Sequence, residues 1–62
     1  MKTKEDVIKN FVNLRNVTGS VPSLMELVQQ TEVTVDDLQR CFPAANVLDS
    51  FAKMANECSS MW

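Results

Sequence analysis

Four side chains with clear chemical capacity lie close together in "TEVTVDDLQRCFP", which spans residues 31–43. Gln39 and Arg40 carry the groups that hydrogen-bond the edges of adenine and guanine in the major groove of DNA. Asp36 and its neighbour Asp37 are carboxylates, and an aspartate can accept a hydrogen bond from cytosine N4. Because the same two charges repel phosphate, the segment combines base-reading groups with a local charge that opposes DNA.

The residue types exclude most enzyme chemistry. The chain has no histidine and one glycine, so a Cys–His pair, a histidine-based metal site and a Gly-rich phosphate loop all lack their components. Asp36 and Asp37 are unsuited to act as a catalytic pair, because adjacent residues on a helix point about 100° apart. We expect no enzyme activity, no cofactor and no bound metal.

The two cysteines, Cys41 and Cys58, are not in C-x-x-C spacing. We expect Cys41 to pack inward beside Phe42 and Cys58 to lie exposed near the end of the chain. The N-terminal "MKTKEDVIKN" lacks the apolar stretch of a secretory signal, and no run of residues has membrane-spanning length. The sequence therefore predicts a cytoplasmic protein with free thiols and no membrane contact.

Length and charge limit the kinds of partner. At 62 residues the chain is expected to form one domain, 1–62, near the lower size limit for folding alone, so we expect it to self-associate as a homodimer. Its net charge is −2, and four of its six basic residues lie in the first quarter of the chain. Any phosphate-binding face must therefore draw on the N-terminal helix, through Lys4 and Arg15.

Local signals predict the first helix, which must position those basic groups. Thr3 and Asp6 form a T-x-x-D capping pattern, and apolar residues then recur at helical spacing. Gly19 offers a stop in the left-handed region. A helix is predicted over about 4–17.

Two short helices follow. An S-x-x-E capping box that begins at Ser23 predicts a helix over about 24–30. A second T-x-x-D pattern, beginning at Thr34, predicts a helix over about 34–42. That helix ends at Pro43, which donates no helical hydrogen bond.

Helical spacing of apolar residues predicts a last helix over about 45–57, followed by a tail, 58–62. Strand signals are nearly absent, so the predicted fold is all-α, a small three- to four-helix bundle. Met25, Met54 and Met61 have two interpretations, since methionine lines partner surfaces and also fills core gaps. The predicted core draws on every helix: Val7, Ile8, Phe11, Leu27, Val33, Leu38, Phe42, Val47, Leu48 and Phe51.

The stretch from Leu24 to Phe42 resembles a helix-turn-helix, in which two short helices follow a longer one. Leu27, Val33 and Leu38 fall where that motif places its core side chains. With its aromatic–proline ending "CFP" and the apolar helix beyond, the pattern is most similar to the N-terminal DNA-binding domain of TetR-type repressors. The opening "G-x-V-P-S" also resembles the helical repeats found beside some homing endonucleases.

The resemblance implies that the helix over 34–42 enters a DNA groove. Val28 departs from the pattern, because a small residue usually stands there, and the departure predicts a wider spacing of the two helices. Glu32 takes a turn position usually held by glycine, which implies a non-glycine residue at positive φ at a cost of about 1 kcal/mol. The side chains that would face the groove are Thr34, Val35, Asp36, Gln39 and Arg40.

The two aspartates have a structural explanation as well. Acids in the first turn of a helix bind free amides and oppose the helix dipole favourably, each contributing about 0.3–1 kcal/mol. Capping alone therefore explains Asp36 and Asp37, and contact with a basic partner or with a base remains the alternative.

Two functions are consistent with these features. The first is a small transcription regulator that binds DNA as a homodimer on paired half-sites. The helix over 45–57 and Trp62 would form its dimer interface. The alternative is an acidic helix-turn-helix protein-interaction module, of the kind found among antirepressors and phage-encoded modulators, that binds a regulatory or host protein. The isoelectric point of about 4.8 and the methionine-rich C-terminal half favour the alternative.

Overall fold

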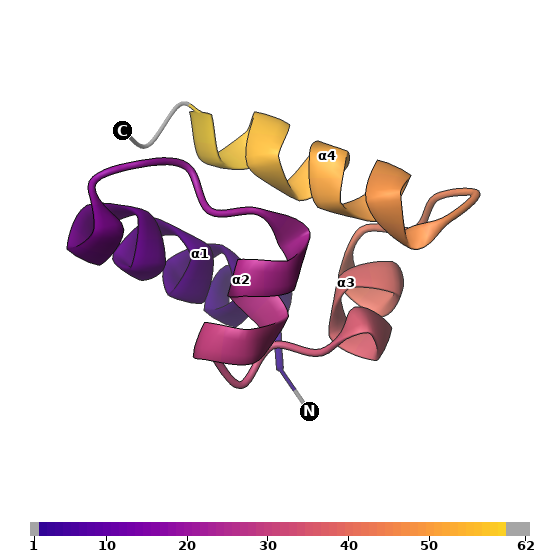
Figure 1. The fold of residues 1–62 in the computed structure, drawn as a ribbon. Coiled ribbons are helices and arrows are strands. Elements are labelled where there is room, and N and C mark those ends of the chain that lie inside the picture. The colour runs from indigo at the N-terminus through magenta and orange to yellow at the C-terminus, as the bar shows by residue number, and fades with distance from the viewer. Residues whose placement is uncertain (1, 60–62) are drawn as a thin grey trace.

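The computed structural model describes residues 2–59, which fold into four helices with no strand in that range. The predicted all-α fold is confirmed. Figure 1 shows α1 behind α2, α3 beside α2, and α4 crossing above them, and α1 packs against each of the other three helices. The expectations for Met61 and Trp62 concern residues outside the described range. The helices are α1 (Lys4–Thr18), α2 (Leu24–Gln30), α3 (Val35–Cys41) and α4 (Val47–Cys58).

Short-range capping sets the start and end of α1. Thr3 Oγ1 accepts from the amide of Asp6 at 3.2 Å, and the Asp6 carboxylate accepts from the amide of Thr3 at 3.4 Å. Gly19 caps the other end with φ of 79°, and its amide donates to the carbonyl of Arg15 at 2.8 Å. The helix therefore ends at Thr18, one residue beyond the predicted end.

Cap residues also explain why α3 and α4 begin later than predicted. Thr34 is the N-cap of α3 and lies outside it, so α3 begins at Val35. Asn46 is the N-cap of α4, where its side-chain oxygen accepts from the amide of Asp49 at 2.9 Å. The helix over 45–57 therefore begins two residues late, at Val47, and ends at Cys58.

The turn between α2 and α3 is built without a left-handed residue. Gly19 is the one residue at positive φ in the described range, so the implied strain at Glu32 is wrong. Thr31 instead turns the chain from an extended conformation. Its hydroxyl donates to the carbonyl of Leu27 at 2.6 Å and accepts from the amide of Val33 at 3.1 Å. The Thr31 side chain thus satisfies backbone groups on both sides of the turn.

The core lies where the four helices converge. Ile8, Val47 and Phe51, also predicted for the core, are partly buried and pack against it. The rings of Phe11 and Phe51 meet edge to face at 5.7 Å between centroids. The buried hydrophobic residues of the core are Val7, Phe11, Leu27, Val33, Leu38, Phe42, Met54 and Cys58.

Two predictions for α4 are wrong. Leu48 is 66% exposed, not in the core, and Cys58 is fully buried, not an exposed residue near the chain end. The reason is helical geometry. The stripe that α4 turns inward includes residues 47, 51, 54 and 58, and Leu48 lies about 100° from Val47 around the helix.

Candidate interaction surfaces

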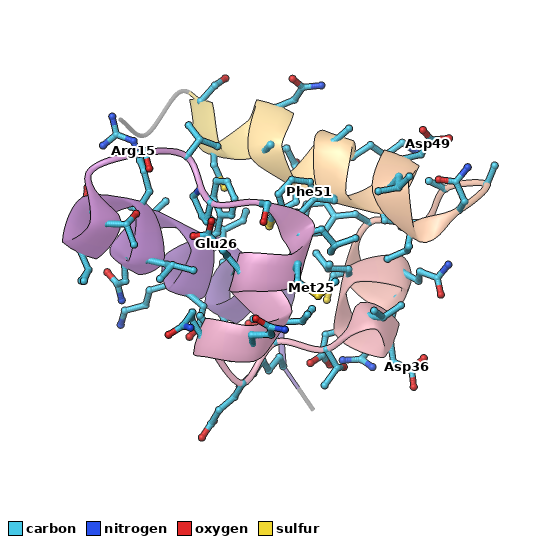
Figure 2. The ribbon with its side chains drawn as sticks, viewed as in Figure 1. Arg15, Met25, Glu26, Asp36, Asp49 and Phe51 are labelled. Atoms are coloured by element: carbon cyan, nitrogen blue, oxygen red, sulfur yellow. The ribbon has the colours of Figure 1, made fainter. Side chains whose placement is uncertain are left out.

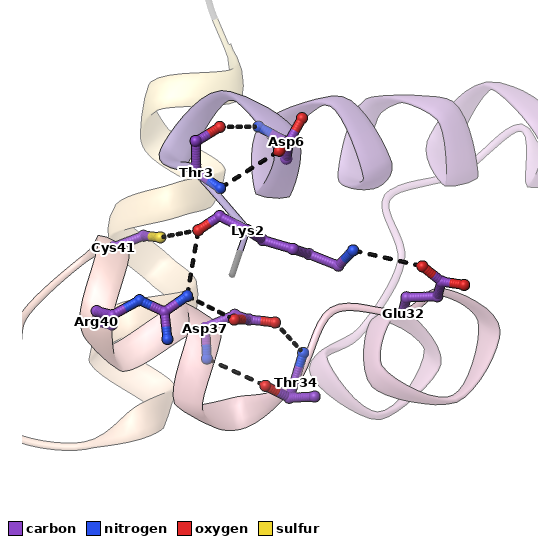
Figure 3. Close-up of polar contacts among 8 residues, drawn as sticks. All are labelled: Lys2, Thr3, Asp6, Glu32, Thr34, Asp37, Arg40 and Cys41. Carbon is purple, nitrogen blue, oxygen red and sulfur yellow. Dashed lines mark hydrogen bonds and ion pairs between the residues drawn. The ribbon is translucent and has the colours of Figure 1, made fainter.

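The predicted DNA-reading residue Arg40 is held in an intramolecular cluster. Its Nη2 donates to Asp37 Oδ1 at 2.7 Å and to the carbonyl of Lys2 at 3.2 Å (Figure 3). Thr34 and Asp37 complete a capping box, in which each side chain accepts from the other residue's amide, at 3.2 and 3.1 Å respectively. One carboxylate therefore caps α3 and orients Arg40 at once.

Hydrogen bonding in this cluster favours the charged forms of both partners. The guanidinium of Arg40, followed by the amide of Thr34, lowers the pKa of Asp37 below its ordinary value of 3.8. The same hydrogen bond raises the pKa of Arg40. The Asp37 side chain is only 12% exposed, so water replaces this partner poorly. Arg40 would therefore have to leave a mostly buried carboxylate before it could hydrogen-bond a guanine.

The structure does not bring the other predicted DNA contacts onto one face. Lys4 pairs with Glu57 at 2.9 Å and lies 5.2 Å from the ring centroid of Phe42, so it joins the start of α1 to the end of α4. Arg15 is eleven residues further along α1, about 16 Å at 1.5 Å per residue. Figure 2 shows Arg15 and Asp36 on opposite sides of the molecule.

Intramolecular partners engage two further basic side chains. Lys2 pairs with Glu32 at 3.5 Å, and Lys53 Nζ donates to the carbonyl of Pro43 at 2.7 Å. With Lys4, Arg40 and Arg15, whose Nη1 donates to Asn16 Oδ1 at 3.2 Å, five of the six basic residues thus have intramolecular partners. Exposed ion pairs contribute only about 0–1 kcal/mol, so phosphate could displace some of them, but each displacement lowers the net gain.

A second surface is apolar. Met25, Val35 and Leu48 are 63%, 41% and 66% exposed, and they come from three different helices. Together they line a groove of about 470 Å³ that Ser23, Leu24 and Val28 complete. In Figure 2, Met25 lies between α2 and α3, on the side of the molecule that faces the viewer. We call this surface the α2–α3–α4 groove.

The apolar residues Val35 and Leu48 are a sequence signal for this groove. Leu48, which is predicted for the core, lines the groove instead, and Val35, which is predicted to face DNA, lines it as well. Each of these side chains lies off the buried stripe of its own helix. When successive helices each carry a large apolar residue outside the buried stripe, packing of the helices can bring these residues together. Such residues therefore indicate a shared exposed surface.

Thr34, at the N-cap of α3, and Asp36 and Gln39, within that helix, are exposed to solvent. Within residues 2–59, no three acidic or cysteine side chains come together in a way that would hold a metal ion. In the same range, none of the helices has the length and apolarity needed to cross a membrane.

Comparison with known protein families, with curated proteins and with solved structures finds no match to this chain. Its function must therefore be argued from the two surfaces themselves.

Proposed function

We propose that this chain is a small acidic protein-interaction module that binds another protein through the α2–α3–α4 groove. The observation that carries the proposal is the convergence of Met25, Val35 and Leu48, which belong to three helices and remain 41–66% exposed. Burying one such side chain fully is worth about 1.5–3 kcal/mol. Contiguous exposed apolar groups of this kind mark interaction sites on small soluble proteins.

A small-molecule site accounts less well for the same groove. Ligand pockets of about 300–1,000 Å³ place a few polar groups that fix the orientation of the ligand. Ser23 supplies the one polar side chain of this lining, and its hydroxyl already accepts from the amide of Glu26 at 3.2 Å. A protein surface needs fewer fixed polar groups, because shape and apolar contact supply most of the affinity.

DNA binding through α3, which the resemblance implies, is the second candidate. The observation that favours it is that Gln39 is exposed on α3, while the Lys4 ammonium lies over Phe42 at the C-terminal end of that helix and the Lys2 ammonium pairs with Glu32 in the turn before it. Asp36 and Asp37 at the start of α3 oppose it. Non-specific affinity comes from phosphate neutralisation, at about one counterion released per contact, so two or three contacts per protomer give weak binding.

Selection from a displayed peptide library tests the first proposal. The wild-type protein serves as bait, and peptides that also bind the Leu48→Ser variant are removed in a counter-selection. We expect enriched peptides whose affinity falls at least ten-fold on Leu48→Ser, because the variant removes an exposed apolar anchor. Serine near a helix N-terminus is well tolerated, so the fold should persist.

Val17→Ser is the matched control. Val17 is 84% exposed, lies in the last turn of α1 and is not among the residues that line the groove. Peptide binding should survive this change. Failure to enrich any peptide, or equal loss of binding in both variants, would refute the groove as the binding surface. A duplex-DNA shift at about 50 mM salt that Gln39→Ala abolishes would instead support the second candidate.

A further inference from the structure

We infer that the segment that occupies the α2–α3–α4 groove is a basic amphipathic α-helix, with apolar anchors three or four residues apart and Lys or Arg beside them. The inference rests on the proposed function and names the class of its partner. Two features of the groove support it: the modes of peptide recognition that the groove permits, and the charges that surround the groove.

The composition of the groove leaves one mode of peptide recognition. Strand addition needs an exposed sheet edge, and residues 2–59 contain no strand. Polyproline segments bind between aromatic side chains, and phosphorylated or acidic motifs bind to clustered arginines. Among residues 2–59, the lining of the groove includes neither an aromatic side chain nor an arginine. What remains is a helix laid into a groove between helices, with Met25 as an adaptable contact.

Charges around the groove select the polar part of that helix. Each of its exposed apolar residues is followed in the chain by an exposed acid: Met25 by Glu26, Val35 by Asp36, and Leu48 by Asp49. Figure 2 shows Glu26, Asp36 and Asp49 on three sides of Met25. No basic side chain lines the groove. We therefore expect apolar anchors to supply affinity and Lys or Arg to supply orientation and selectivity.

A second copy of this chain fits the groove less well. In a two-fold symmetric dimer the same patch meets itself, so the groove of one copy faces the groove of the other. Asp36 and Asp49 would then approach their own counterparts, and like charges across an interface oppose association. A basic partner meets the same acids with the opposite sign.

Two synthetic helices of about 18 residues, long enough to form a helix on binding, provide the test. Both carry leucines at three- and four-residue spacing. The first has lysines beside them, and the second has glutamates at the same positions. Fluorescence anisotropy should show at least ten-fold tighter binding of the lysine peptide at about 50 mM salt, with the difference shrinking at about 300 mM. Leu48→Ser should weaken binding of the lysine peptide, and Val17→Ser should not.

A pair of charge variants isolates the electrostatic part. Asp36→Asn and Glu5→Gln each change the net charge by one, but only Asp36 adjoins a groove residue. Binding of the lysine peptide should fall about two- to five-fold with Asp36→Asn, the range of an exposed ion pair, and stay unchanged with Glu5→Gln.

Several outcomes would overturn the inference. Equal binding of the two peptides, tighter binding of the glutamate peptide, or an equal effect of the two charge variants would each exclude a basic partner, although the groove would remain a binding surface. A dimer of the wild type that Leu48→Ser converts to a monomer would assign the groove to a second copy. Failure of both peptides, together with an empty library selection, would remove the proposed function itself.

Discussion

At the level of single residues, Arg40 shows how a neighbour redirects a side chain from the role that its type suggests. An exposed arginine on a helix of this kind is a good reader of guanine. Here Asp37, three residues earlier on α3, holds it at 2.7 Å, and the carbonyl of Lys2 accepts a second hydrogen bond from the same nitrogen. The cluster stabilises the start of α3 and reduces what Arg40 offers to DNA.

Acid should weaken this cluster. The folded protein lowers the pKa of Asp37 below 3.8, so its stabilising contribution is complete above that value and is lost as the pH falls through it toward the folded pKa. Asp37→Asn removes the titrating group while keeping an oxygen that can accept from Thr34. Wild type should therefore be more stable than Asp37→Asn at pH 7, and the difference should shrink by pH 3. Urea unfolding midpoints of the two proteins at pH 7 and pH 3 measure this difference in stability. A difference between wild type and Asp37→Asn that stays constant or grows in acid would contradict the prediction.

The two thiols should differ in reactivity. Cys58 is fully buried, and burial raises its pKa to about 11, whereas Cys41 is partly exposed. The thiolate is the reactive form of cysteine. An aromatic disulfide reagent at pH 8 should therefore modify Cys41 quickly, and Cys58 only as fast as the protein opens. Cys41→Ser should abolish the fast phase. Two fast phases in the wild type would place Cys58 at the surface.

Ser50 is the one buried side chain in the described range whose polar atom has no hydrogen-bond partner. An unsatisfied buried hydroxyl costs about 1–3 kcal/mol, and alanine also has the higher helix propensity. Ser50→Ala should stabilise the protein by about 0.5–1 kcal/mol, after allowance for lost packing. For a domain of this size, a stabilisation of that magnitude raises Tm by a few degrees, which a circular dichroism melt measures. An unchanged Tm, or a fall, would show that the hydroxyl is satisfied in solution.

At the level of elements, each helix begins at a side chain that binds its first amides. Thr34 caps α3, which has only seven residues and depends strongly on its first turn. Thr34→Ala should therefore cost about 0.5–2 kcal/mol, whereas Thr34→Ser, which keeps the hydroxyl, should cost much less. Chemical denaturation of the three proteins measures the difference. Equal losses would mean that the methyl group of Thr34, not its cap, stabilises α3.

Helix positions were predictable because caps act over three or four residues. Thr3, Ser23 and Gly19 are local signals, and the predicted bounds of α1 and α2 lie within one residue of those observed. The pairing of Asp37 with Arg40 was also within reach, since residues three apart on a helix are neighbours. The contact of Arg40 with Lys2 spans 38 residues, and no local pattern predicts it.

The exposure of Leu48 was harder to predict for a similar reason. An apolar residue in the first turn of an amphipathic helix is predicted to be buried. Whether it is buried depends on how that helix is rotated against its neighbours. Burial of Cys58 depends on the same rotation, which the contacts of α4 with α1 and α3 determine. The groove is thus a property of helix packing, which the spacing of residues along one helix does not determine.

At the level of the whole molecule, basic and acidic side chains are arranged differently. Five of the six basic side chains have intramolecular partners, whereas Glu26, Asp36 and Asp49 stay exposed around an apolar groove. A net charge of −2 adds no general attraction for phosphate. This distribution supports a partner with apolar anchors and positive charge, and it gives DNA few free contacts.

Amide chemical-shift mapping of the labelled protein tests this account most directly. Parallel titrations with the lysine peptide and with mixed-sequence duplex DNA, both at about 50 mM salt, report which residues each probe contacts. The account predicts saturable peptide shifts at Met25, Val28, Val35 and Leu48, and weak DNA shifts that vanish as salt is added. Salt-resistant DNA shifts at Thr34 and Gln39, with no peptide shifts along the groove, would contradict it and establish α3 as the functional surface.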